Sequence, residues 1–193
     1  MKSVLISIKP KWCELIASGK KTVEVRKTKP KLKTPFKVYI YCTTPKNKHD
    51  NLVLTPFGYD VGSEAAYCHY AGNSNGKVIG EFACDKVVQF ENSFFEPAFD
   101  EASDLSCVRW DELVKYLGNK DYGYGWHISD LVIYDKPREL SEFYAEGDCD
   151  FKNCSNCDRL RFISKTRADC NLEEGYKPIT RPPQSWCYVE DTE

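Results

Sequence analysis

The sequence contains no long hydrophobic run, and no stretch approaches the roughly 18 consecutive apolar residues that suggest a membrane-spanning helix. The apolar segment Val4–Ile8 near the start is too short for the core of a secretion signal, and Lys9-Pro10-Lys11 ends it. The composition excludes collagen-like, coiled-coil and low-complexity classes. Because 41% of the 193 residues are hydrophobic, the chain can bury a core. We therefore expect a soluble, cytoplasmic protein of one domain with an appendage, not bound to a membrane.

Acidic residues are scarce at the start of the chain. Residues 1–48 hold thirteen Lys and Arg side chains but only two acids, Glu14 and Glu24, whereas the remaining residues hold 14 basic and 27 acidic side chains. The overall charge of −2 conceals this asymmetry. A basic segment of this kind favours a polyanionic partner such as nucleic acid. The alternative is a solvated lysine-rich surface that is balanced by acids elsewhere in the fold.

Cysteine is abundant, with ten in the chain, and without a secretion signal these residues should be reduced thiols or metal ligands. Cys42 and Cys84 lie in apolar, strand-like segments and are expected in the core. A second group forms the pattern C-x4-C-x2-C-x12-C in a polar tail: Cys149, Cys154, Cys157 and Cys170. This spacing predicts a structural zinc site, with free thiols or disulfides as alternatives. A catalytic zinc is not expected, because four cysteine ligands leave no open position.

The hydrophobic pattern predicts several strands and short helices without βαβ regularity. A helix should begin at Pro10 and end at Gly19, with Trp12, Leu15 and Ile16 facing the core. The connection 44–76 has little periodicity and is interpreted as a loop or insertion. The expected strands are Ser3–Ile8, Thr22–Arg26, Phe36–Thr43, Lys77–Phe90 (with a bulge at Gly80), Gly123–Tyr134 and Ser185–Val189, and further helices are Trp110–Leu117 and a short piece through Phe143. These elements predict an α+β fold, a small, mostly antiparallel β-barrel with flanking short helices.

One motif carries a resemblance to a known family. Residues 19–26 fit the pattern G-x-K-x-x-E-x-R and follow directly on a short helix that opens with Lys9-Pro10. Together with the later strands around Gly80-Glu81-Phe82 and at 124–128, this motif resembles the ASCH domain, a branch of the PUA-like superfamily of β-barrels. The likeness covers roughly residues 2–143. We interpret 1–143 as an ASCH-like domain and 144–193 as a Cys-rich extension that packs back on the barrel.

The resemblance implies a cleft lined by Lys21, Glu24 and Arg26 that recognises RNA or a nucleotide. The residue types agree with this, because Lys and Arg supply positive charge for a phosphate or a developing oxyanion. Alternation along a strand places Glu24 and Arg26 on one face, where Glu24 could accept hydrogen bonds from a base amine or pass protons. The alternative is that Glu24 and Arg26 form no more than an ion pair across the barrel.

Four further residues are candidate ligand-binding groups. Lys9 belongs to the basic region at the start of the first helix. Trp126 offers a plane on which a base could stack, although an apolar strand residue is more often part of the core. His127 belongs either to the cleft or to the interior as a structural histidine. Gln184 follows two prolines that fix an extended approach, and either Gln184 or Arg181 could return to the cleft together with the last strand.

The function predicted from the sequence is an RNA- or nucleotide-binding module. The alternative is a hydrolase acting on a modified nucleoside, or a ribonuclease, in which Lys21 and Glu24 would be catalytic. In the N4-acetylcytidine amidohydrolase branch of the superfamily a threonine occupies the position of Glu24, while Lys21 matches. That branch also needs a further glutamate, for which Glu112 is a weak candidate.

Overall fold

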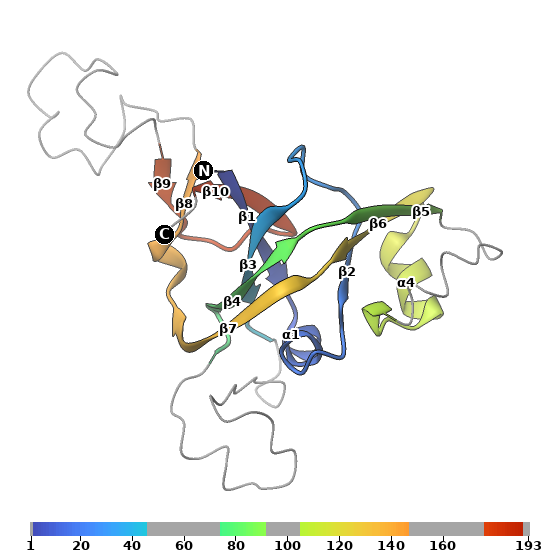
Figure 1. Cartoon of the computed structure of the whole chain (residues 1–193). Helices are drawn as coiled ribbons and strands as arrows, with labels where there is room; N and C mark the ends of the chain where they lie inside the picture. Colours follow the sequence, from blue (N-terminus) through green and yellow to red (C-terminus); the bar gives the residue numbers. More distant parts are fainter. Residues whose placement is uncertain (1, 46–73, 92–104, 147–175, 191–193) are drawn as a thin grey trace, which may run out of the picture.

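A computed structural model of the chain describes residues 2–45, 74–91, 105–146 and 176–190. The strands form a five-stranded sheet in the order β10-β1-β3-β4-β7, a three-stranded sheet β2-β6-β5 and the pair β8-β9 (Figure 1). The strands are β1 (Lys2–Ile8), β2 (Val23–Arg26), β3 (Phe36–Cys42), β4 (Lys77–Cys84), β5 (Val87–Glu91), β6 (Tyr122–His127), β7 (Ser129–Arg138), β8 (Tyr144–Glu146), β9 (Tyr176–Pro178) and β10 (Trp186–Glu190). The helices are α1 (Pro10–Ala17), α4 (Trp110–Leu117) and the short 3₁₀ helix η2 (Leu140–Glu142).

The expected α+β class with mostly antiparallel strands is confirmed. Among the described strands every pair is antiparallel except β1 and β3, which run parallel. A parallel neighbour requires a long connection, and α1 and β2 supply it between β1 and β3. The described strands are hydrogen-bonded as separate sheets, so closure of the whole into one barrel stays a prediction.

Two segments that the sequence predicts as single strands are each divided in the structure. The first breaks at Asp85 and Lys86 into β4 and β5, and the second breaks at Ile128 into β6 and β7. In both cases one half belongs to the five-stranded sheet and the other to the three-stranded sheet. Both breaks are therefore corners at which the chain passes between sheets, and the backbone N–H of His127 joins them by donating to Lys86 O at 2.9 Å.

The bulge expected at Gly80 is present in β4. Ile40 of β3 pairs with Gly80, whereas the next residue, Tyr41, pairs with Val78, so one residue of β4 is extra. A Cβ atom at Gly80 would lie 2.3 Å from the carbonyl oxygen of Val132 on β7. Glycine is therefore required here by the close approach of the neighbouring strand.

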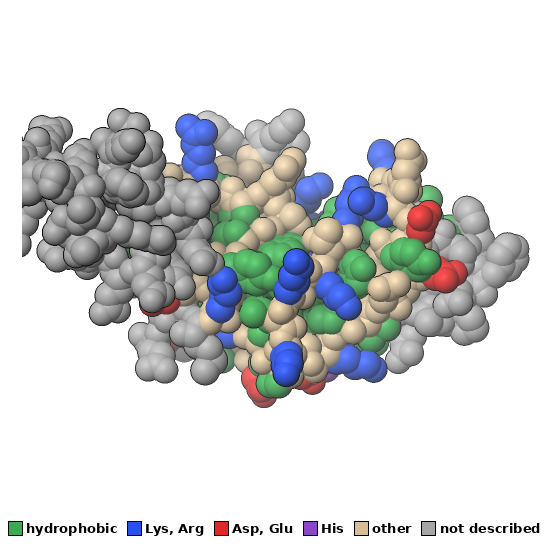
Figure 2. Space-filling view, turned by 90° about the horizontal axis from the view of Figure 1, so that it is seen from above, with side chains coloured by type: hydrophobic (Ala, Val, Ile, Leu, Met, Phe, Trp, Pro, Cys, Tyr) green, Lys and Arg blue, Asp and Glu red, His purple; other side chains and the backbone are tan. Residues whose placement is uncertain are grey.

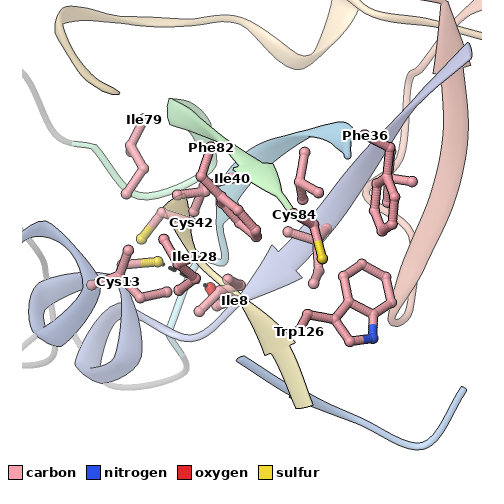
Figure 3. Packing of buried hydrophobic residues seen from close by; sticks show 14 residues of the cluster. Ile8, Cys13, Phe36, Ile40, Cys42, Ile79, Phe82, Cys84, Trp126 and Ile128 are labelled. Carbon is pink, nitrogen blue, oxygen red and sulfur yellow. Dashed lines mark hydrogen bonds between the residues drawn. The ribbon is translucent and has the colours of Figure 1, made fainter. Parts of the chain in front are cut away.

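The main core lies between the two larger sheets and α1 (Figure 3). Trp126 is fully buried in it and makes edge-to-face contacts with Phe36 and Trp186, with ring centroids 5.8 and 5.9 Å apart. Cys13 and Cys42 lie beside one another and Cys84 is also buried, so the expectation of core cysteines is confirmed for these positions. Burial raises the pKa of the Cys13 thiol well above its usual value.

The two helices pack on different parts of the fold. Helix α1 begins at Pro10, as predicted, and buries Cys13 and Ile16 against the main core. Gly19, with a φ of 71°, follows its end, which fits the left-handed conformation that closes many helices. Helix α4 lies beside the three-stranded sheet and packs Leu113 and Leu117 in a smaller core cluster.

The last strand of the chain returns to the first. β10 pairs antiparallel with β1, placing Trp186 opposite Ile6 and Glu190 opposite Lys2. Residues 46–73 of the predicted connection and 147–175 of the predicted extension lie outside the described residues. The division of the chain at 143 therefore stays a prediction. No helix in the described ranges is long and apolar enough to span a membrane.

Candidate functional site

A cavity of about 770 Å³ opens where β2, α1, α4 and the segment before β10 meet. Its floor is β2, whose four residues are all buried. One wall is formed by α1 and the end of β1, and another by α4. The segment 182–185 closes the remaining side, held against β1 because Ser7 N–H donates to Ser185 O at 2.9 Å and Ser7 Oγ donates to Pro183 O at 2.7 Å. The cavity thus combines parts of the chain more than 170 residues apart.

Glu24 lies at the centre of a buried cluster of charges on the cavity floor. Its Oε2 is 3.2 Å from Lys21 Nζ and its Oε1 is 2.9 Å from Arg26 Nη2. The three side chains are between 1% and 8% exposed, so solvent screens these pairs little. The structure therefore brings together the three motif residues that the sequence singled out. It also shows that the ion pair between Glu24 and Arg26 forms, and that the pair lies on the floor of a cavity.

Lys21 is held by three partners within the protein. Its Nζ donates to Val23 O at 2.9 Å and to Ser106 O at 2.7 Å, and it forms the ion pair with Glu24. Nζ also lies 5.3 Å from the centre of the Trp12 ring. Lys21 therefore fixes Glu24 and ties the segment before α4 to the cavity floor.

Arg26 is bound less completely. Its Nη2 donates to Ser7 O at 2.7 Å and forms the ion pair with Glu24, and its Nη1 reaches Ser185 Oγ at the long distance of 3.5 Å. Its Nε is buried and has no hydrogen-bond partner among the described residues. Buried polar groups are nearly always paired, so this unpaired donor is unusual.

The cavity is also lined by two aromatic residues that the sequence did not single out as ligand-binding candidates. Trp12 packs against the main core, as expected, but is only half-buried, and Tyr116 on α4 is 39% exposed. Burial raises the pKa of Tyr116, while the nearby Arg26 guanidinium opposes that rise, so the hydroxyl is protonated at neutral pH. For Tyr116 a signal was present in the sequence, because an aromatic residue lies on the polar face of an amphipathic helix.

The rim of the cavity carries most of the other candidates. Lys9 and Gln184 line it, as does Glu112, which pairs with Lys11 at 3.5 Å. Arg181, the alternative to Gln184, is not among the lining residues. Lining side chains that carry positive charge outnumber the two carboxylates: Lys9, Lys21, Arg26, Lys27 and Lys120 against Glu24 and Glu112. The cavity is therefore electropositive overall.

Trp126 and His127 do not line the cavity. Trp126 belongs to the core, because residues of β6 that point inward pack between the two sheets. His127 lies at the corners between the sheets, where its Nδ1 is 2.6 Å from Asp85 Oδ1. That hydrogen bond is the main reason that the pKa of Asp85 is lowered. The geometry thus assigns both residues to the fold and gives neither a place at the cavity.

The cysteines of the predicted zinc site, Cys149, Cys154, Cys157 and Cys170, lie outside the described residues. Within the described ranges no group of three or more His, Cys, Asp or Glu side chains is arranged to hold a metal ion. The zinc site therefore stays a prediction from the spacing alone.

Comparison with known proteins identifies the family. The family model of the ASCH domain matches residues 6–114, which include the end of β1, all of α1, the cavity floor and most of α4. The chain therefore belongs to the ASCH domain family, as the motif at residues 19–26 indicated. No curated protein matches the sequence significantly.

Solved structures of an ASCH protein from Zymomonas mobilis are similar to this chain. A Tyr-to-Phe mutant of ZmASCH aligns with a TM-score of 0.56 at 18% identity, covering 98% of this chain and 91% of the other. A Ser-to-Ala mutant aligns with a TM-score of 0.55 at 18% identity, covering 97% and 88%. At this identity the likeness establishes the shared fold.

Proposed function

We propose that this protein is an RNA- or nucleotide-binding module whose ligand occupies the cavity above Lys21, Glu24 and Arg26. The observation that carries the proposal is the buried charge cluster on the floor of an electropositive cavity of about 770 Å³. A volume of this order is typical of sites for small ligands. Membership of the ASCH family supports the same class of ligand at a coarse level.

Arg26 is the residue that meets a phosphate group in this proposal. Its Nη1 makes only a long contact with Ser185 Oγ, and the guanidinium is held in place through Ser7 O and Glu24. Arginine forms strong, charge-assisted hydrogen bonds with phosphate oxygens. The exposed amine of Lys9 on the rim adds positive charge to the same space.

Trp12 and Tyr116 supply the aromatic surface for a base. Both line the cavity, and neither is fully buried. Base-on-aromatic stacking tolerates any base, whereas an acceptor such as Glu24 can distinguish bases by accepting a hydrogen bond from an exocyclic amine. Stacking therefore provides affinity, and Glu24 provides selectivity.

Titration calorimetry with the four ribonucleoside monophosphates tests the proposal. Wild-type protein should bind at least one of them, and Lys9→Gln and Gln184→Ala should weaken that binding, because both residues line the cavity and are exposed. Gln89→Ala is a matched control, since Gln89 is an exposed glutamine on β5 that does not line the cavity. Equal affinity in all three variants, or no binding by the wild type, would overturn the proposal.

A hydrolase acting on a modified nucleoside or on RNA is the second candidate. Its support is the position of Glu112, which lines the same cavity as Lys21 and Glu24. Against it stands the geometry of Lys21, whose Nζ is bound by two backbone carbonyls and paired with Glu24. Incubation with N4-acetylcytidine or RNA distinguishes the two. A hydrolase would release product, and Glu24→Gln would lower the rate of release roughly 10²–10⁴-fold while binding is retained.

A further inference from the structure

The segment between β2 and β3 carries a regular alternation of lysines. Residues 27–33 read Lys-Thr-Lys-Pro-Lys-Leu-Lys, and the four lysines are exposed, whereas Pro30 is buried and Leu32 packs against the main core. We call residues 27–33 the lysine loop. The residues between the lysines thus hold the loop to the protein, and the lysines present positive charges to solvent.

The lysine loop is fixed to β10 by two side chains. Trp186 Nε1 donates to Thr28 Oγ1 at 3.0 Å, and the backbone N–H of Lys31 donates to Tyr188 Oη at 2.7 Å. Aromatic rings also lie beneath the amines of this surface. Lys29 Nζ is 5.5 Å from the centre of the Tyr124 ring, and Lys2 Nζ lies 5.0 Å from that of Tyr188. Exposed lysines interleaved with aromatic rings are typical of surfaces that bind single-stranded nucleic acid.

The charges of the lysine loop are not neutralised within the described part of the chain. Lysines elsewhere pair with carboxylates, as Lys37 does with Glu81 and Lys77 with Glu139. None of the four loop lysines forms an ion pair in the described ranges. Figure 2, viewed from the side on which the loop lies, shows Lys and Arg side chains across the middle of this face and acidic side chains at its margins. This surface therefore attracts polyanions.

The loop starts at the cavity itself, since Lys27 and Thr28 line the rim. From there it leads away toward Tyr188 on the edge strand β10 and Lys2 on the neighbouring β1. We propose that the ligand is a single-stranded RNA: one nucleotide enters the cavity, and the phosphates that follow it along the strand bind the lysine loop. This inference rests on the proposed function. A duplex does not fit it, because a paired base cannot leave its stack to enter a cavity without unpairing.

The test measures fluorescence anisotropy of a labelled single-stranded RNA over a range of salt concentrations. The loop variant Lys29→Gln/Lys31→Gln/Lys33→Gln should lower affinity on the order of tenfold at low salt and reduce the salt slope by about two, since each phosphate contact on a single strand contributes about 0.7. The control variant Lys86→Gln/Lys115→Gln/Lys136→Gln removes the same charge from exposed lysines that do not line the cavity. It should retain the wild-type affinity and slope within a small factor.

A second measurement separates this inference from the proposed function. A mononucleotide that binds the cavity should bind the loop variant as tightly as the wild type, because Lys29, Lys31 and Lys33 do not line the cavity. Failure of every mononucleotide to bind the wild type contradicts the proposed function. If a mononucleotide binds the wild type but the loop and control variants lose RNA affinity equally, the role of the lysine loop is contradicted and the proposed function is not. Tighter loop-dependent binding of duplex RNA or of a polyglutamate peptide than of single-stranded RNA also overturns it.

Discussion

Oε1 of Glu24 lies 2.9 Å from Nη2 of Arg26, two residues further along the same short strand, and both side chains are only 8% exposed. The pair lies on the floor of the cavity, and Lys21 contacts the other carboxylate oxygen of Glu24. One carboxylate thus lies between two buried cations. This arrangement links the stability of the fold to the properties of the site.

The buried cluster makes Glu24 important for stability. Glu24→Ala should reduce the free energy of unfolding by about 3–5 kcal/mol, because the remaining two cations would be buried without their shared partner. Urea denaturation followed by circular dichroism measures this. Glu112→Ala is the control, since that carboxylate is exposed and its pair with Lys11 should contribute no more than about 1 kcal/mol. Equal losses in the two variants would show that the cluster does not stabilise the protein.

Two tryptophans should respond in opposite ways. Trp126→Ala should destabilise the protein by roughly 3–5 kcal/mol and leave the nucleotide affinity of the folded fraction unchanged, because Trp126 is fully buried and does not line the cavity. Trp12→Ala should weaken nucleotide binding by about 1–3 kcal/mol, because a stacking surface is lost. Thermal unfolding and calorimetry give both quantities for each variant. Loss of binding in Trp126→Ala at a temperature at which the variant is folded would contradict this assignment.

The corner between the sheets should contribute to acid sensitivity. The pKa of Asp85 is lowered in the folded protein, mainly by the hydrogen bond with His127. A lowered pKa means that the folded state favours the carboxylate. The resulting stabilisation is present at pH values above the pKa of the unfolded state, about 3.9, and is lost as the pH falls through the pKa of the folded state. Asp85→Asn should therefore reduce the fall in melting temperature on acidification, while Asp135→Asn, an exposed control, should not. Superimposable profiles for Asp85→Asn and the wild type would exclude this role.

The tail cysteines give a prediction that rests on spacing. Protein purified without chelator should contain about one zinc ion per chain, since four thiolates complete a tetrahedral site. Replacing Cys154 and Cys157 with serine should release the metal, and elemental analysis measures it. Cys187→Ser is the control, because burial raises the pKa of that thiol to about 11 and it lies on β10. Wild-type protein without metal would favour free thiols or disulfides, which thiol titration separates.

The sequence predicts the local elements of the site better than their assembly. Alternation along β2 correctly placed Glu24 and Arg26 together, and the proline and glycine signals gave the limits of α1. The partners of Lys21 could not be derived, because Ser106 O is contributed from a segment 85 residues away. The same is true of the wall at 182–185, whose position depends on hydrogen bonds from the backbone N–H and the side-chain hydroxyl of Ser7.

Hydrophobic patterns also failed to show where strands end. The polar residues His127, Ser129 and Asp130 flank Ile128, but polar residues also occupy the exposed face of an uninterrupted strand, so composition alone does not locate the corner. It is defined by tertiary contacts, among them the N–H of Ile128 donating to Thr22 O at 2.8 Å. Helical periodicity correctly predicted that Trp12 faces the core, but it does not show that the same side chain also lines a cavity.

Chemical-shift mapping by NMR during titration with a ribonucleoside monophosphate tests the central claim most directly, because it locates the ligand without altering the protein. We predict that the amide signals of Ser7, Glu24, Arg26 and Ser185 shift with a common saturation curve, together with the indole signal of Trp12. The signals of Asp85 and His127 at the corner between the sheets should remain unchanged. Shifts that cluster at that corner, or saturable binding that leaves Glu24 and Arg26 unaffected, would contradict the account.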